Sequence, residues 1–194
     1  MALNDIVQDQ FREAAELTTR ALPVVARDLV RLAQETASRI VIGGKVLLLG
    51  NGGSAADAQH VAAEFVVKLN LERAALPALA LTTDASVLTA AANDLGYAEV
   101  FARQIRALAG VNDVVAAFST SGNSANVVRA LAAARESRVF TAAFLGGDGG
   151  AAAANADLTL IVPSPNPQRI QELHMLMGHA WVSLVEEMVF RGAR

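Results

Sequence analysis

The sequence predicts an α/β fold: a five-stranded parallel sheet with helices on both faces and an N-terminal helical extension. Five short apolar runs recur along the chain, and such runs are typical of strands buried on both faces. Segments with apolar residues at helical spacing separate them, and strands that alternate with helices indicate right-handed crossovers and a parallel sheet. The predicted strands are residues 45–49, 78–81, 114–118, 141–145 and 158–162.

Helices account for most of the remaining chain. Two of them, residues 5–21 and 24–42, precede the first strand and are separated at Leu22-Pro23, because proline interrupts a helix. The second ends at Gly43-Gly44, since glycine suits the left-handed position that closes many helices. Further helices are predicted at residues 54–68, 84–107, 124–136, 149–154 and 167–191.

The composition is that of a globular protein. Of 194 residues, 53% are hydrophobic and 18% are charged. Mean hydropathy is +0.36, yet no run approaches the ~20 apolar residues that a membrane-spanning helix needs. We therefore expect no membrane partner and assign the apolar residues to a core and a subunit interface. Because no repeat or linker interrupts the chain, we expect one domain over residues 1–194, with a helical extension at 1–43 and an α/β core at 44–194.

The charge and the cysteine content limit which binding partners and which cellular location we expect. The net charge is −3 and no Lys/Arg cluster forms a basic face, so we expect no nucleic-acid partner. An anionic ligand must then be held by local groups rather than by a global positive field. The absence of cysteine excludes disulfides, thiolate metal sites and a cysteine nucleophile. No basic region followed by an apolar stretch marks a signal peptide, and we expect a cytoplasmic location.

A glycine-rich segment follows the first predicted strand. It reads Gly50-Asn51-Gly52-Gly53-Ser54-Ala55-Ala56-Asp57 and is called the glycine loop below. Ser54 with Asp57 three positions later resembles a capping box, which predicts that the next helix begins there. Glycines let a backbone approach a ligand closely, and the amides of a helix N-terminus suit a phosphate. The alternative is a tight strand-to-helix turn that binds nothing.

A second polar segment follows the third predicted strand. It reads Ser119-Thr120-Ser121-Gly122-Asn123-Ser124 and is called the serine loop below. Its four hydroxyls offer hydrogen-bond donors to a phosphate with little positive charge, and Ser124 is placed to cap the next helix. The alternative is a serine-rich loop with only that capping role. Two such loops at the carboxyl edge of one parallel sheet favour a binding site, and neither matches a Walker or dinucleotide motif.

Two predicted helices carry groups that could transfer protons or bind a metal. His60 and Glu64 are four residues apart and share one helix face. On the last helix, Gln171 and His179 lie roughly 12 Å apart along the axis, so they reach one metal only in a stretched geometry or from different subunits. The alternatives are a surface pair of little value for His60 and Glu64, and a core histidine for His179.

Taken together, these segments resemble the sugar isomerase (SIS) domain of the phosphoheptose isomerase family. The match begins at Asn51-Gly52-Gly53-Ser54, continues with Asp57-Ala58-Gln59-His60 and Glu64, and runs in order over nearly the whole chain. The later matching segments are Leu81-Thr82-Thr83-Asp84, Asn93-Asp94-Leu95-Gly96-Tyr97, the serine loop, and Arg169-Ile170-Gln171-Glu172 with His174 and His179.

The resemblance implies a fold and an activity. The fold is a flavodoxin-like sheet, assembled as a homotetramer in which residues 1–43 serve oligomerisation and active sites lie between subunits. The activity is the conversion of sedoheptulose 7-phosphate to D-glycero-D-manno-heptose 7-phosphate through an enediol, the first step of nucleotide-activated heptose synthesis. One zinc ion per subunit is implied. Two alternatives stay open: a non-enzymatic SIS regulator that binds a replication initiator protein, and an isomerase of another sugar phosphate.

The resemblance also implies roles for residues of this chain. Glu64 is expected as the catalytic base and His179 as the acid. The expected zinc ligands are His60, Glu64, Gln171 and His179. The expected substrate-binding residues are Asn51, Gly52, Gly53, Ser54, Glu64, Asn93, Asp94, Ser119, Thr120, Ser121, Ser124 and Gln171. One departure is Lys68, where relatives often carry arginine, and lysine cannot form a bidentate contact there.

Overall fold

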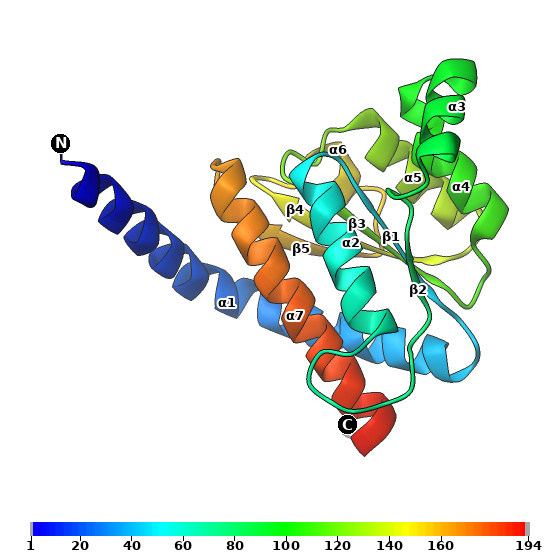
Figure 1. Ribbon diagram of the computed structural model, residues 1–194, viewed down its shortest axis with the longest axis horizontal. Helices are drawn as coiled ribbons and strands as arrows, with labels where there is room; N and C mark the ends of the chain where they lie inside the picture. Colours follow the sequence, from blue (N-terminus) through cyan, green and yellow to red (C-terminus); the bar gives the residue numbers. More distant parts are fainter. Residues whose placement is uncertain (1, 193–194) are drawn as a thin grey trace.

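A computed structural model describes residues 2–192 and confirms the parallel α/β fold (Figure 1). All five strands run parallel, in the order β2-β1-β3-β4-β5. This order is the flavodoxin-like one, in which ligands bind where the strand order reverses, between β1 and β3. The strands are β1 (Val46–Gly50), β2 (Ala78–Ala80), β3 (Val114–Ser119), β4 (Phe140–Gly146) and β5 (Leu158–Val162).

Helices cover both faces of this sheet, as predicted (Figure 1). Residues that alternate along a strand face opposite ways, so Val46 and Leu48 pack with α1, α2 and α7, while Leu47 and Leu49 pack with α4 and α5. The helices are α1 (Leu3–Val41), α2 (Gly53–Val66), α3 (Ala85–Leu95), the 3-10 turn η1 (Tyr97–Glu99), α4 (Val100–Leu108), α5 (Ala125–Glu136), α6 (Gly150–Ala153) and α7 (Pro167–Arg191).

The apolar side chains that raise the mean hydropathy fill two clusters, one on each face of the sheet. All five residues of β1 are buried, as expected of a strand covered on both faces. Among residues 2–192, no helix is both long enough and apolar enough to cross a membrane.

The prediction of two N-terminal helices is wrong, because α1 is one helix of 39 residues with Pro23 inside it. Proline removes one backbone hydrogen bond, at a cost of about 3 kcal/mol in a helix interior. That cost is offset by a continuous buried stripe on both sides of the proline, which includes Leu17, Ala21 and Val25. The first half of α1 projects away from the sheet (Figure 1).

The predicted helix over residues 84–107 is also divided. The structure ends α3 at Leu95 and resumes with η1 and α4 after Gly96. Gly96 has a φ of 88°, in the region that glycine enters without steric cost, and it therefore redirects the chain between the two helices. Tyr97 is consequently placed in a turn near the glycine loop.

Candidate functional site

The glycine loop and the serine loop lie side by side, because they follow neighbouring strands whose residues Gly50 and Phe118 are paired in register. Together they enclose a cavity of about 70 Å³, called the serine cavity. Helix α7 contributes Gln171, whose Nε2 would lie 2.5 Å from a Cβ added at Gly53. The lining residues are Asn51, Ser54, Phe118, Ser119, Thr120, Ser121, Ser124 and Gln171.

The serine cavity is equipped with neutral donors. The hydroxyl oxygens of Ser119 and Ser121 accept backbone N–H groups from Gly122 at 3.1 Å and Asn123 at 3.2 Å. A hydroxyl that accepts in this way keeps its own hydrogen to donate. Helix α5 begins directly after the loop, and its N-terminal amides favour an anion. No Lys or Arg is among the described residues that line this cavity, so an anion here would be held by dipoles.

The predicted capping box at Ser54 and Asp57 is wrong. Helix α2 begins one residue earlier, at Gly53, with Gly52 as its N-cap, so Ser54 lies inside the first turn and is buried. The glycines allow the chain to enter the helix before the serine is reached. Ser124 does stand at the N-cap of α5, as predicted, yet its side chain makes no capping hydrogen bond. Its hydroxyl lines the serine cavity instead.

A pair of asparagines joins the two loops. Asn51 and Asn126 exchange two amide hydrogen bonds, each of 2.8 Å, and the hydroxyl of Tyr97 donates to Asn51 Oδ1 at 2.9 Å. Sequence reasoning assigned no function to Asn126 or Tyr97. Asn126 lies two positions beyond the serine loop, which is a usable signal. Tyr97 meets Asn51 only through the fold, at a separation of 46 residues.

A second group of polar side chains gathers further along α2, where it packs beside α7. His60 Nε2 lies 3.2 Å from Glu64 Oε1 and 2.9 Å from the Nε2 of His179. These three residues, called the trio, offer ligand atoms that all lie within 4.8 Å of one another. The side chains of His60 and Glu64 are 49% and 22% exposed, so the trio borders the surface of a single chain.

The trio fits a divalent metal ion. Two imidazoles and a carboxylate are a ligand set that zinc prefers, and here their donor atoms converge on one point. A nearby observation agrees. Asp57, one turn before His60, is buried and its Oδ2 has no hydrogen-bond partner among the described residues. Burial raises the pKa of Asp57 to about 6, although His60 acts to lower it, and a cation at the trio would compensate its charge.

Comparisons with known proteins agree with this arrangement. The SIS domain family matches residues 10–146. A phosphoheptose isomerase of Aquifex aeolicus (strain VF5) is 50% identical over 183 residues, which cover 94% of this chain and 96% of that protein. The chain belongs to the phosphoheptose isomerase family.

Solved structures of the phosphoheptose isomerase family have the same fold. The enzyme structure from Neisseria gonorrhoeae has a TM-score of 0.90 and 42% sequence identity, and it aligns with 96% of this chain and 100% of its own. The structure of a phosphoheptose isomerase from Francisella tularensis has a TM-score of 0.93 and 32% identity, with the same coverage. The likeness therefore extends over nearly all of this chain.

The residues that the family resemblance implies fall into three places in this chain. The glycine and serine loops with Gln171 form the serine cavity, and His60, Glu64 and His179 form the trio. Gln171 lies about 12 Å from His179 along the axis of α7, and its side-chain amide lies against Gly53. Asn93 and Asp94 lie in the last turn of α3, exposed and hydrogen-bonded to each other at 2.7 Å, outside the serine cavity.

Proposed function

We propose that this chain isomerises sedoheptulose 7-phosphate to D-glycero-D-manno-heptose 7-phosphate through an enediol intermediate. The observation that carries the proposal is the trio, because a carboxylate held beside two imidazoles supplies both a base and an acid. The names of the relatives point to the same reaction, since those from Aquifex aeolicus and Roseiflexus sp. (strain RS-1) are both called phosphoheptose isomerase. We further propose a cytoplasmic location, compatible with a chain that lacks cysteine.

The serine cavity is the proposed phosphate site. Its volume of about 70 Å³ suits a small group, given the roughly 30 Å³ that a water molecule occupies in the liquid. Hydroxyls, an amide and the N-terminus of α5 surround that volume, and these are donors that a phosphate accepts. The proposed substrate-binding residues are Asn51, Gly52, Gly53, Ser54, Ser119, Thr120, Ser121, Ser124 and Gln171, with Glu64, Asn93 and Asp94 toward the sugar.

The proposed chemistry moves one proton between adjacent carbons. Glu64 takes a proton from C1, and the electron pair of the broken C1–H bond forms the C1–C2 double bond. At the same time His179 protonates the C2 oxygen. The enediol then loses the proton of its C1 hydroxyl to His179, the C1 carbonyl forms, and Glu64 returns a proton to C2. Positioned acid–base groups of this kind contribute typically 10²–10⁴-fold in rate.

We propose zinc as the resident metal, one ion per subunit, held by His60, Glu64 and His179 with Gln171 as a further ligand. Zinc bound there would polarise the substrate carbonyl. A carboxylate engaged by zinc is a weaker base, so Glu64 either alternates between the two tasks or leaves more of the proton transfer to His179. Gln171 packs against Gly53 in its own chain, so we propose that it reaches the zinc of a neighbouring subunit; a stretched geometry within one chain is the alternative.

Assembly into a homotetramer through residues 1–43 is the accompanying proposal. In the projecting half of α1, Leu3, Val7 and Phe11 are 82%, 53% and 76% exposed, and their spacing of four puts them on one face. Further along, α1 and α7 border an apolar groove of about 380 Å³. Exposed apolar surface of this extent is typical of subunit interfaces.

The proposed function is tested by a panel of substrates. The chain is incubated with sedoheptulose 7-phosphate, fructose 6-phosphate and arabinose 5-phosphate, with and without a chelator, and aldose–ketose conversion is followed by NMR. We expect conversion of the heptose alone, lost with the chelator and restored by Zn²⁺. Conversion of a shorter sugar only would establish the other-substrate alternative. No conversion of any sugar would contradict the isomerase and favour the regulator.

A subunit-mixing experiment tests the shared site. Two inactive variants, Glu64→Gln and Gln171→Ala, are unfolded together, refolded and assayed. If Gln171 serves the trio of a neighbour, mixed tetramers contain sites with both native residues and regain part of the activity. Activity no higher than the sum of the separate variants would show that each chain uses its own Gln171.

A further inference from the structure

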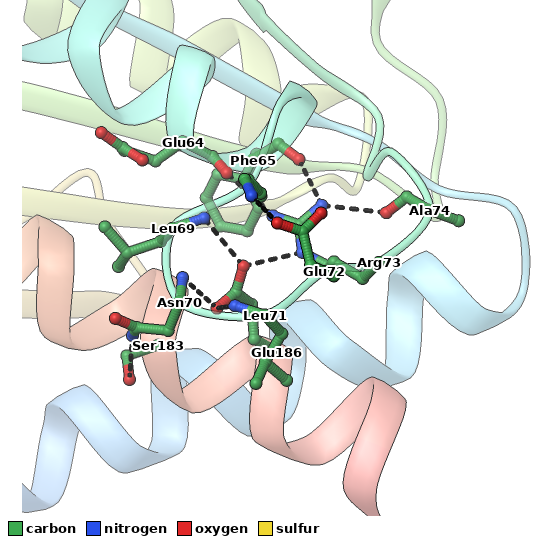
Figure 2. Close-up of polar contacts among 11 residues, drawn as sticks. Glu64, Phe65, Leu69, Asn70, Leu71, Glu72, Arg73, Ala74, Ser183 and Glu186 are labelled. Carbon is green, nitrogen blue, oxygen red and sulfur yellow. Dashed lines mark hydrogen bonds and ion pairs between the residues drawn. The ribbon is translucent and has the colours of Figure 1, made fainter.

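A buried ion pair outside the trio anchors the segment that follows α2 (Figure 2). Arg73 Nε donates to Glu186 Oε1 at 2.8 Å, and each side chain is only 1% exposed. Glu186 also accepts three backbone N–H groups of the segment, from Leu69 at 2.9 Å, Asn70 at 2.9 Å and Leu71 at 3.3 Å. The carboxylate therefore organises the whole turn around itself.

Two further donors of Arg73 reach the end of α2. Its Nη2 donates to the backbone oxygen of Glu64 at 2.8 Å, and its Nη1 donates to that of Phe65 at 2.9 Å (Figure 2). The last carbonyl groups of a helix lack partners within the helix and attract a cation. Arg73 thus closes the C-terminus of α2 by holding the backbone of Glu64, the proposed base.

The other end of the pair belongs to the helix that carries His179. Glu186 lies two helical turns beyond His179 on α7 and so on the same face of that helix. A second contact sets the distance between the helices on the near side of the trio. A Cβ at Gly178 would lie 2.7 Å from Val61 Cγ2, so α2 and α7 approach closely there only because residue 178 is glycine.

The chemistry of the pair is that of a permanent ionic link. Burial raises the pKa of Glu186, but hydrogen bonds from Leu69, Asn70 and Arg73 outweigh it, and the pKa lies below its ordinary value. A buried ion pair is a poor way to gain stability, because an apolar pair of similar volume is often equally stable. What an apolar pair cannot supply is a directed link between two helix backbones.

We propose that Arg73 and Glu186 are positioning residues, which hold α2 and α7 at the separation at which Glu64 and His179 bind the metal and transfer protons. The proposal rests on the function proposed above for the trio. Neither residue touches substrate in this account. The pair acts through the backbone of Glu64 on one side and the face of α7 on the other.

The test compares Glu186→Gln with a matched control, Asp113→Asn. Asp113 is likewise a buried carboxylate that accepts backbone N–H groups, from Lys45 at 2.9 Å and Gly110 at 2.7 Å, and a lysine Nζ at 2.6 Å. It lies directly before β3, at the amino ends of the strands, whereas the serine cavity lies at their carboxyl ends. Both substitutions replace one buried carboxylate by an amide, so both should lower Tm.

Zn²⁺ affinity, measured by competition with a chromophoric chelator well below Tm, separates the two variants. We expect E186Q to weaken Zn²⁺ binding and lower kcat, each by about tenfold, the lower end of the range for residues that orient metal ligands. KM should stay unchanged, because the serine loop is untouched. D113N should keep wild-type affinity and kcat. Equal losses of Zn²⁺ affinity and kcat in both variants would show that Arg73 and Glu186 have only a structural role.

A double variant, R73M/E186L, separates positioning from stability. It removes both charges, so no unpaired charge stays buried, although three backbone N–H groups lose their acceptor. Tm then reports whether the variant is folded, and Zn²⁺ affinity and kcat should stay low. Wild-type affinity and kcat in a folded double variant would overturn the proposal, and this variant decides the matter if E186Q does not fold. The Zn²⁺ titration needs no substrate, so an inactive wild-type chain would count against the proposed function without deciding the positioning role.

Discussion

The serine cavity and the trio are built in opposite ways. The cavity lies at the point where the strand order reverses, and its polar groups come from two loops and the first turns of two helices. It uses hydroxyls, amides and helix dipoles. The trio lies on the flanks of α2 and α7, uses ionisable side chains, and joins residues 119 positions apart. One region relies on backbone turns and the other on the packing of two helices.

The difference between the two regions indicates which substitutions should impair phosphate recognition and which should impair catalysis. Loops fixed by neighbouring strands keep their donors in place with few side-chain contacts, so recognition of an anion depends mainly on individual hydroxyls. The proposed proton transfer and metal binding would depend on the spacing of two helices, and a change of about 1 Å in such geometry can cost 10²-fold in rate. Substitutions in the two regions should therefore affect KM and kcat separately.

The largest effect is expected at the trio. Glu64→Gln keeps the size of the side chain and removes its basicity, so kcat should fall about 1000-fold while the affinity for sedoheptulose 7-phosphate changes little. Steady-state kinetics and calorimetric titration of the substrate measure the two quantities. Turnover near the wild-type rate would remove Glu64 from the mechanism. A parallel loss of substrate binding would contradict the claim that the trio serves catalysis and the serine cavity serves binding.

A stability effect is expected at His174, which lies on α7 between the two regions. It is fully buried, and burial lowers its pKa to about 4, although a hydrogen bond with the Leu145 carbonyl raises it. Because the folded pKa is below the unfolded value of about 6.5, the unfolded chain takes up the proton first as pH falls. The contribution of His174 to stability is therefore present above pH 6.5 and lost toward pH 4, by about 3 kcal/mol.

Urea unfolding at pH 7 and pH 4.5 measures this contribution. His174→Gln retains an amide donor for Leu145 and does not titrate, so its stability should depend less on pH than that of the wild type. At pH 7, substrate and Zn²⁺ binding should stay near wild-type values, since neither region loses a ligand. An identical pH dependence in both proteins would show that His174 does not titrate as described.

A smaller effect is expected in the serine loop. Ser121→Ala removes one donor of the proposed phosphate site. A hydrogen bond to a charged group contributes about 1.5–3 kcal/mol, so KM should rise at least tenfold. Zn²⁺ affinity and kcat should not change. Ser137→Ala, at the opposite end of α5, is the control and should leave KM as it is. A fall in kcat with constant KM would place the phosphate elsewhere.

The smallest effect is expected at Lys68, the position at which the family resemblance implies an arginine. Its Nζ pairs with Glu72 on the surface, with side chains 44% and 86% exposed. Exposed pairs contribute about 0.2–1 kcal/mol, so Lys68→Arg should change stability by less than about 0.5 kcal/mol and kcat by less than about twofold. A large gain in kcat would assign this position a contact with sugar or a neighbouring subunit.

Local patterns were sufficient to predict the sheet and the loops that follow β1 and β3. The strands differ from prediction by at most one residue at either end, because most of the apolar runs are bounded by glycine, proline or polar residues. Continuity of α1 through Pro23 was not predictable, since the compensating contacts come from α7, far along the chain. Packing likewise determines that Gln171 faces Gly53 rather than His179.

The partners of the site were hardest to infer. Asp57, Arg73 and Glu186 are charged residues in apolar or loop surroundings, where sequence alone favours solvent exposure. Their burial follows from the packing of α2 against α7, which no short motif encodes. The family resemblance implied roles for residues within the shared motifs. The residues that pack around those motifs, such as Arg73 and Glu186, could be identified only from the structure.

Isomerisation in D₂O tests the central account most directly. Sedoheptulose 7-phosphate is incubated with the wild-type chain, and the aldose product is analysed by NMR for deuterium at C2. Proton transfer through an enediol predicts a heptose 7-phosphate that carries solvent deuterium at C2, formed by the wild type and not by Glu64→Gln. Equal product from the variant, or an aldose and a recovered ketose that both stay free of deuterium after prolonged incubation, would contradict the account.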